Sequence, residues 1–106
     1  MSARAPQSLN TASHVVYRIA PGLLLVFKPR GHREAPHAHP HRQRLRILRG
    51  KLRIESARGS VTLTPSARAY SLAAGRQHAT TALADTWLIA EALAAPSAQP
   101  VSRRRA

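Results

Sequence analysis

Two prolines inside a histidine-rich stretch constrain the fold of this chain more than any other feature of its sequence. Residues 31 to 50 read GHREAPHAHPHRQRLRILRG and contain four of the six histidines. Pro36 and Pro40 lack a backbone N–H donor and fix their own φ, which disfavours a helix and favours a strand ending in a bend. Beyond the bend, arginines alternate with residues of the other parity, the pattern of a half-buried strand; these residues are Gln43, Leu45 and Ile47.

Two histidines before the bend have the spacing of metal ligands. His37 and His39 lie two residues apart, so in an extended segment both imidazoles leave the same side of the backbone and can converge on one ion. Gln43 shares the parity of the core positions, and a buried amide needs a polar partner, which such an ion would provide. The alternatives are an exposed His-x-His loop and a structural amide at Gln43.

The spacing across this stretch resembles the first motif of the cupin superfamily. The match begins at Gly31 and continues with His37 after five intervening residues, His39 after one, Gln43 after three and Gly50 after six. Gln43 stands where the family usually has Glu.

A second stretch resembles the second cupin motif. Residues 73 to 78 read AAGRQH, with Gly75 and His78 in register, although Ala73 stands where the family usually has Pro and Ala82 where it often has Asn. The resemblance implies an antiparallel all-β barrel or jelly roll, the cupin-like double-stranded β-helix. It also implies one metal site, whose ligands would be His37, His39, Gln43 and His78.

The proposed ligands are three neutral imidazoles and one amide, so a divalent ion would keep its full charge. Imidazole suits zinc, iron, nickel or copper better than manganese or magnesium. The uncompensated charge favours a small anionic ligand or substrate, and Arg33 and Arg76 are candidates for a clamp on it. Because an amide cannot act as a base, catalysis would have to recruit Glu34, Glu55 or a metal-bound water, so a non-catalytic binding barrel is the alternative.

Period-two alternation and regular Gly and Pro spacing predict an all-β barrel or sandwich without the resemblance. The expected elements are short strands joined by tight turns: 15–20 and 23–27 around Pro21–Gly22, 42–48 and 52–55 as a hairpin around Gly50–Lys51, 61–64 after Gly59–Ser60, then 69–72, 78–83 and 86–93. A helical turn over 90–95 is the alternative for the last segment.

The length of 106 residues predicts one domain, over residues 13–95, between a flexible arm at 1–12 and a disordered basic tail at 96–106. The chain has no cysteine, which fits a reducing compartment. The apolar run from Gly22 to Phe27 is too short to span a membrane. We therefore expect a soluble, cytoplasmic protein.

The formal charge of +13, from 17 basic residues against four acidic ones, favours anionic partners. The excess is nearly all arginine, so a compositional habit of the source is the alternative. A third function class is nucleic-acid binding through an outward arginine stripe, but only four aromatic residues exist and none lies on it. The stripe would comprise Arg42, Arg44, Arg46, Arg53 and the tail at 103–105.

Barrel edges need cover, so a homodimer is expected. The aromatic residues are expected to anchor the core or the dimer interface: Tyr17, Phe27, Tyr70 and Trp87. Three further histidines, His14, His32 and His41, are expected at surface or edge positions.

Overall fold

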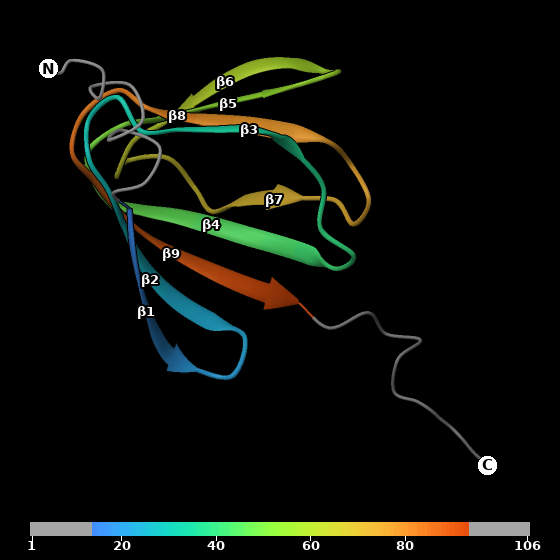
Figure 1. Ribbon diagram of the computed structural model, residues 1–106, viewed down its shortest axis with the longest axis horizontal. Helices are drawn as coiled ribbons and strands as arrows, with labels where there is room; N and C mark the ends of the chain where they lie inside the picture. The colour runs from blue at the N-terminus through green and yellow to red at the C-terminus, as the bar shows by residue number, and fades with distance from the viewer. Residues whose placement is uncertain (1–13, 94–106) are drawn as a thin grey trace, which may run out of the picture.

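A computed structural model describes residues 14–93, which form nine strands in two antiparallel sheets (Figure 1). One sheet has the order β1-β2-β9-β4-β7 and the other the order β3-β8-β5-β6. The strands are β1 (Val15–Ala20), β2 (Leu23–Lys28), β3 (Arg33–His37), β4 (Arg42–Arg49), β5 (Leu52–Ser56), β6 (Gly59–Leu63), β7 (Tyr70–Leu72), β8 (His78–Ala82) and β9 (Thr86–Leu93). The predicted all-β class is confirmed.

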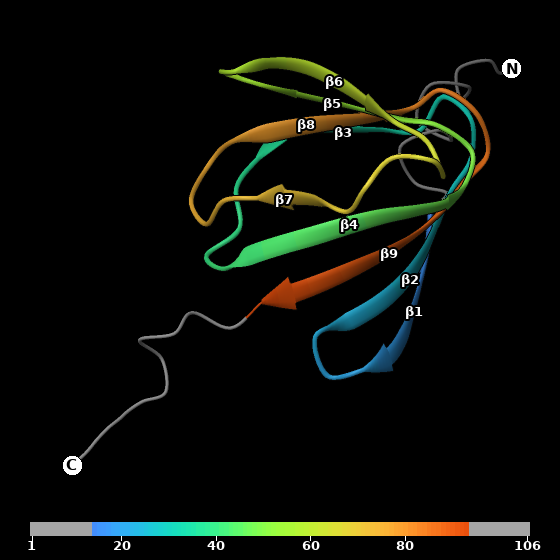
Figure 2. The same ribbon diagram turned by 180° about the vertical axis from the view of Figure 1, so that it is seen from behind.

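The two sheets stack face to face as a jelly roll, a relation that the reverse view in Figure 2 shows equally well. Alternate residues of each strand point between the sheets, so the core forms from both inner faces. Leu52 and Ile54 are almost completely buried in one sheet, and Ile47 and Leu88 in the other. The parity read from the sequence for the segment after Pro40 is confirmed, with Leu45 buried and the arginines of β4 exposed.

Two predicted hairpins are present. The β1–β2 hairpin turns at Pro21–Gly22, and β5 and β6 pair from Leu52 with Leu63 to Ser56 with Gly59. The second turn lies at 57–58, two residues earlier than expected. The last segment is a strand through Leu93, so the described part of the predicted helical turn is extended instead.

The hairpin predicted around Gly50–Lys51 is wrong. β4 pairs with β7 and β9, whereas β5 pairs with β6 and β8, so the chain crosses here from one sheet to the other. Gly50 has φ +101°, and a Cβ at this position would collide with the carbonyl of Asp85 and lie 2.6 Å from Thr86 Oγ1. The buried Thr86 hydroxyl donates to the Lys51 carbonyl at 3.1 Å, which fastens the crossing to the start of β9.

The predicted arm at 1–12 and the predicted tail at 96–106 lie outside the described residues. Between residues 14 and 93, no helix is long and apolar enough to cross a membrane. The cytoplasmic location expected from the sequence stays a prediction.

Candidate metal centre

Three histidines from the two sequence motifs converge in the structure. His37 ends β3, His39 lies in the connection to β4, and His78 begins β8, directly opposite His37 in the β3–β8 pair. Their ring centroids are 4.5 Å apart for His37 and His78, 4.9 Å for His37 and His39, and 5.3 Å for His39 and His78. One nitrogen of each ring lies within 4.8 Å of the other two, which is compatible with three ligands of one ion. We call these residues the histidine triad.

Backbone carbonyls orient two rings of the triad. His37 Nδ1 lies 2.7 Å from the carbonyl oxygen of Ala35, and His78 Nδ1 lies 3.2 Å from that of Arg76. If Nδ1 donates in each case, the neutral ring keeps the lone pair of Nε2 for a metal ion, and the ring orientation is fixed beforehand. This arrangement fits the metal site implied by the sequence motifs.

Burial keeps two members of the triad, His39 and His78, in the form that binds metals. Burial lowers the pKa of His39 below its ordinary value of 6.5, and the neighbouring His37 and His78 lower it further. Burial also lowers the pKa of His78, although its bond to the Arg76 carbonyl opposes this effect. His39 and His78 are therefore neutral at neutral pH, and only a neutral imidazole can ligate a cation.

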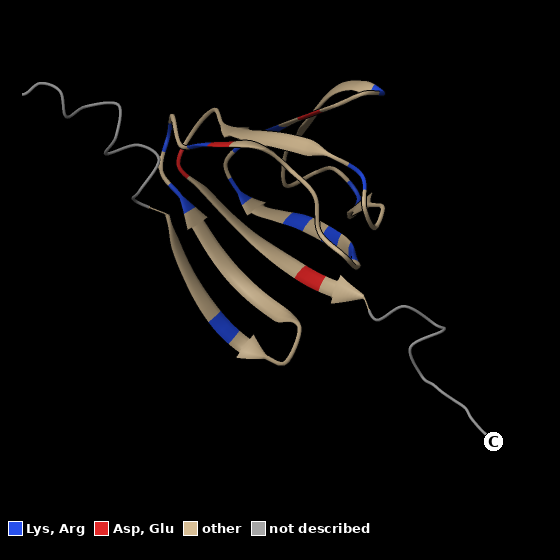
Figure 3. Ribbon diagram, turned by 45° about the vertical axis from the view of Figure 1, so that its right-hand side comes forward, with Lys and Arg blue, Asp and Glu red and all other residues tan. Residues whose placement is uncertain are grey.

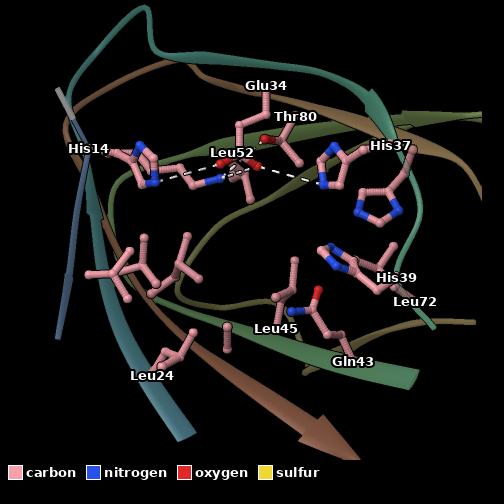
Figure 4. A pocket seen from close by; sticks show the side chains of 16 residues that line it. His14, Leu24, Glu34, His37, His39, Gln43, Leu45, Leu52, Leu72 and Thr80 are labelled. Atoms are coloured by element: carbon pink, nitrogen blue, oxygen red, sulfur yellow. Dashed lines mark hydrogen bonds and ion pairs between the residues drawn. The ribbon is translucent and has the colours of Figure 1, made fainter. Parts of the chain in front are cut away.

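The triad opens into a cavity of about 150 Å³ between the two sheets. Gln43, from β4 on the opposite sheet, lines the same cavity and extends toward His39 (Figure 4). Most of the wall is apolar, with Leu45, Leu52 and Leu72 among its residues. The cavity therefore combines one polar corner with a hydrophobic interior.

An ion pair between the buried Lys28 and the half-buried Glu34 also lines the cavity, and no sequence pattern predicted it. Lys28 is only 6% exposed, and its Nζ lies 3.3 Å from Glu34 Oε1 and 3.2 Å from Thr80 Oγ1. Burial raises the pKa of Glu34, but Lys28, His37 and His14 together outweigh this effect, so the net pKa lies below its ordinary value. Glu34 Oε1 also lies 3.9 Å from His37 Nε2. Of the two carboxylates considered as a possible catalytic base, Glu34 and Glu55, Glu34 is thus the one beside the triad.

The two arginines expected to clamp a substrate lie elsewhere. Arg33 and Arg76 both line a hollow of about 320 Å³, together with Glu55 and Gln77, whereas neither lines the cavity of Gln43 and His39. Arg33 also approaches Glu55, with 3.9 Å between Nη2 and Oε1. His78 borders both spaces. Substrate binding by these arginines stays a prediction.

His14 and His32 are not both at the surface as expected. His32 is 1% exposed and its ring lies 4.6 Å from that of His14, centroid to centroid. Both Nε2 atoms face the second oxygen of Glu34, Oε2, at 3.9 Å for His14 and 3.8 Å for His32. The turn before β3, closed by a 2.9 Å hydrogen bond from the His32 N–H to the Pro29 carbonyl, is packed inward instead of lying at the surface.

The fold and the histidine triad together define a cupin-fold protein with a candidate metal centre. A cupin superfamily protein from Desulfitobacterium hafniense has a TM-score of 0.68 and 15% identity, covering 89% of this chain and 84% of that one. The cupin_2 domain of an XRE family transcriptional regulator from Enterobacter cloacae has a TM-score of 0.63 and 15% identity, covering 77% and 97%.

A third solved structure, KdgF from Halomonas sp., has a TM-score of 0.60 and 22% identity over 80% of this chain and 81% of that one. At these identities the likeness shows the fold alone. No sequence family matches the chain, and no curated protein matches it significantly. The cupin resemblance read from the two motifs is thereby confirmed at the level of the fold.

Proposed function

We propose that this protein binds a divalent transition metal ion through the histidine triad, with the Gln43 amide oxygen as a further ligand. The observation that carries the proposal is the convergence of three imidazoles, two of them oriented through Nδ1 by backbone carbonyls. Imidazole-rich sites suit zinc, iron, nickel or copper. Such an ion would supply Lewis-acid chemistry at the polar corner of the cavity.

The ligand of this metal, in our proposal, is a small anion such as a short carboxylate. The triad and Gln43 contribute no negative charge, and Lys28 already neutralises Glu34, so a bound ion would attract an anion. The cavity of about 150 Å³ is smaller than the roughly 300–1,000 Å³ of pockets for drug-sized molecules. The leucines of its wall would accommodate a short apolar body behind the charged group.

A sensing or carrying role has more support than catalysis. The motif position that usually supplies a carboxylate holds Gln43, and the carboxylate of Glu34 is engaged with Lys28. A base at the reacting centre is thus missing from the expected place. One structural neighbour is itself a domain of a transcriptional regulator, although that role belongs to that protein.

Elemental analysis of tag-free protein tests the metal proposal. We expect close to one transition metal ion per chain from the triad, lost in a His37→Ala, His78→Ala double variant and retained in a His41→Ala control. His41 is the matched control because it lies next to the site, with its ring 6.2 Å from that of His39, but is no member of the triad. Equal metal content in wild type and double variant, with both folded, would disprove the site.

We also propose that a second copy of the chain covers the outer face of β1 and β2. β1 is an edge strand, and its outward side chains are exposed although apolar: Val15 at 42%, Tyr17 at 51% and Ile19 at 53%. Tyr17 stacks on Trp87, which in turn contacts Phe27, with 6.4 and 4.9 Å between ring centroids. An edge strand can pair with its own copy about a twofold axis, and such pairing would cover this apolar face.

Nucleic-acid binding is the least supported of the three functions considered. Blue bands follow one another along β4 in Figure 3, with a red band on the neighbouring β9. Arg44 pairs with Glu91 at 2.8 Å, and Arg53 lies in the other sheet, paired with Glu55 at 3.3 Å. The four strand arginines therefore do not form one continuous stripe. Binding to DNA or RNA that weakens steeply with added salt would support this function, and no binding at low salt would remove it.

A further inference from the structure

The carboxylate of Glu34 separates the histidine triad from a second group of metal-type side chains. His14 precedes β1, His32 lies between β2 and β3, and Glu34 belongs to β3. One ligand atom of each lies within 4.8 Å of the other two. Figure 4 shows Glu34 between His14 on one side and His37 on the other, with dashed contacts to both. Two separate segments, one before β1 and one at the start of β3, thus bring these side chains together.

The distances in this group resemble ligand spacings more than hydrogen bonds. The Nε2 atoms of His14 and His32 lie 3.9 and 3.8 Å from Glu34 Oε2, too far for a hydrogen bond. Ligands of a tetrahedral ion with bonds of about 2.0–2.1 Å lie roughly 3.3 Å apart. Small rotations would therefore suffice to close the group around an ion.

The two oxygens of Glu34 have different neighbours. Oε1 lies near Lys28 Nζ and His37 Nε2, at 3.3 and 3.9 Å, whereas Oε2 faces His14 and His32. The ammonium of Lys28 therefore occupies one oxygen and leaves the other directed at the two imidazoles. Two imidazoles and one carboxylate are a donor set that zinc and iron(II) accept, with open positions for solvent or a ligand.

We propose that His14, His32 and Glu34 form a second divalent-cation site, adjacent to the triad and independent of it. The site takes a borderline transition metal such as Zn²⁺, Co²⁺ or Fe²⁺. It uses none of the triad's ligands, because the two groups share no residue. Lys28 weakens it, since a fixed positive charge beside Glu34 opposes a second cation.

Titration of the full-length, chelator-treated protein with Co²⁺, followed by visible absorption, tests this proposal. Wild type should take up two equivalents. His14→Gln should lose one of them, with an affinity drop of at least about tenfold, while His39→Gln should lose the other. His41→Gln is the control and should keep both, because His41 belongs to neither group. Circular dichroism of each variant verifies that it is folded.

Each combination of results distinguishes this site from the triad. If the wild type binds one equivalent of Co²⁺, and this binding is lost in His14→Gln but retained in His39→Gln, the result supports the second site and disproves metal binding by the triad. One equivalent that persists in His14→Gln, or two that both persist, overturns the second site whatever the fate of the triad. No uptake by the wild type overturns both sites.

A Lys28→Met variant gives a second readout that does not remove a ligand. Loss of the ammonium should raise the affinity of the site formed by His14, His32 and Glu34 for Co²⁺ about tenfold. It should also make the melting temperature rise more steeply with added Co²⁺ than in wild type. Unchanged or weaker binding of the second equivalent in a folded Lys28→Met protein contradicts a cation beside Glu34. If Lys28→Met folds only in the presence of Co²⁺, the ion replaces the lost partner of Glu34, which supports the site.

Discussion

The backbone N–H of Gly75 donates a 2.7 Å hydrogen bond to the carbonyl of His39, and this bond joins the two sequence motifs. Gly75 has φ +75°, a conformation that glycine adopts at little cost. The turn before β8 can therefore bring its N–H to the loop that carries His39. The bond fixes the backbone of the one triad member that lies outside a strand. Ala73, at the usual proline position of the motif, does not prevent this closure.

The first prediction concerns the missing carboxylate. Gln43→Glu should raise the affinity for added Zn²⁺ at least tenfold, or about 1.4 kcal/mol, because it places a negative charge in the cavity of the triad. Isothermal titration of metal-free protein measures the change. Gln77→Glu is the matched control, since Gln77 lines the outer hollow and not this cavity. An equal gain in both variants would mean that net charge alone, not ligation at position 43, sets the affinity.

The triad could be predicted from the sequence because it depends on spacing. His37 and His39 lie two apart, and the motif register supplied His78. Glu34 could not be placed in this way. In a regular strand it would have the opposite parity to His37, but the β3–β8 pairing shifts register between these two residues, and both line the cavity. A bulge is a tertiary feature that no alternation pattern records.

The assignment of each strand to one of the two sheets could not be predicted from the sequence pattern either. Two alternating runs joined at Gly50–Lys51 resemble a hairpin, yet β4 and β5 belong to different sheets. The close approach of Gly50 to Asp85 and Thr86 accompanies this crossing, and it involves residues far along the chain that a local pattern does not include. Similarly, the isolated Lys28 after an apolar run gave no sign of burial, because its partner Glu34 comes from another strand.

The second prediction tests the crossing at Gly50. Gly50→Ala should destabilise the fold by more than the roughly 1–3 kcal/mol that a positive φ costs a non-glycine residue, because its Cβ would also collide with the backbone at Asp85. Gly59→Ala is the control, with φ +116° and nothing within 4 Å of the added Cβ. Urea unfolding compares the two variants. Equal losses of stability would show that backbone conformation alone, and not the close approach, requires glycine at position 50.

The third prediction concerns pH. The pKa values of His14, His39 and His78 are all lowered in the folded chain, with burial as the largest cause for each. The folded state thus binds protons more weakly than the unfolded chain, so stability is fully present above the ordinary value of 6.5 and is lost as pH falls below it. Glu34, whose pKa is also lowered, extends the loss below pH 4.5.

The melting temperature of metal-free protein should accordingly fall from pH 7.5 to pH 5.5, with the steepest change below 6.5. A His39→Gln variant, which removes one of these groups, should show a shallower fall. A melting temperature that is flat, or that rises, over this range would contradict the lowered pKa values.

The last prediction tests the proposed homodimer through the edge strand. Ile19→Lys places a charge on the outward face of β1, where the side chain is 53% exposed in the single chain, so the monomer should keep its fold. Because a twofold interface contains two copies of each residue, we expect a loss of at least about 2 kcal/mol, roughly a thirtyfold weaker dimer. Leu83→Lys is the control, since Leu83 is comparably exposed at 40% but follows β8. Sedimentation velocity should then find dimers for wild type and for Leu83→Lys, but monomers for Ile19→Lys at low micromolar concentration. Monomeric wild type would exclude the dimer, whereas equal dissociation of both variants would place the interface elsewhere than on β1.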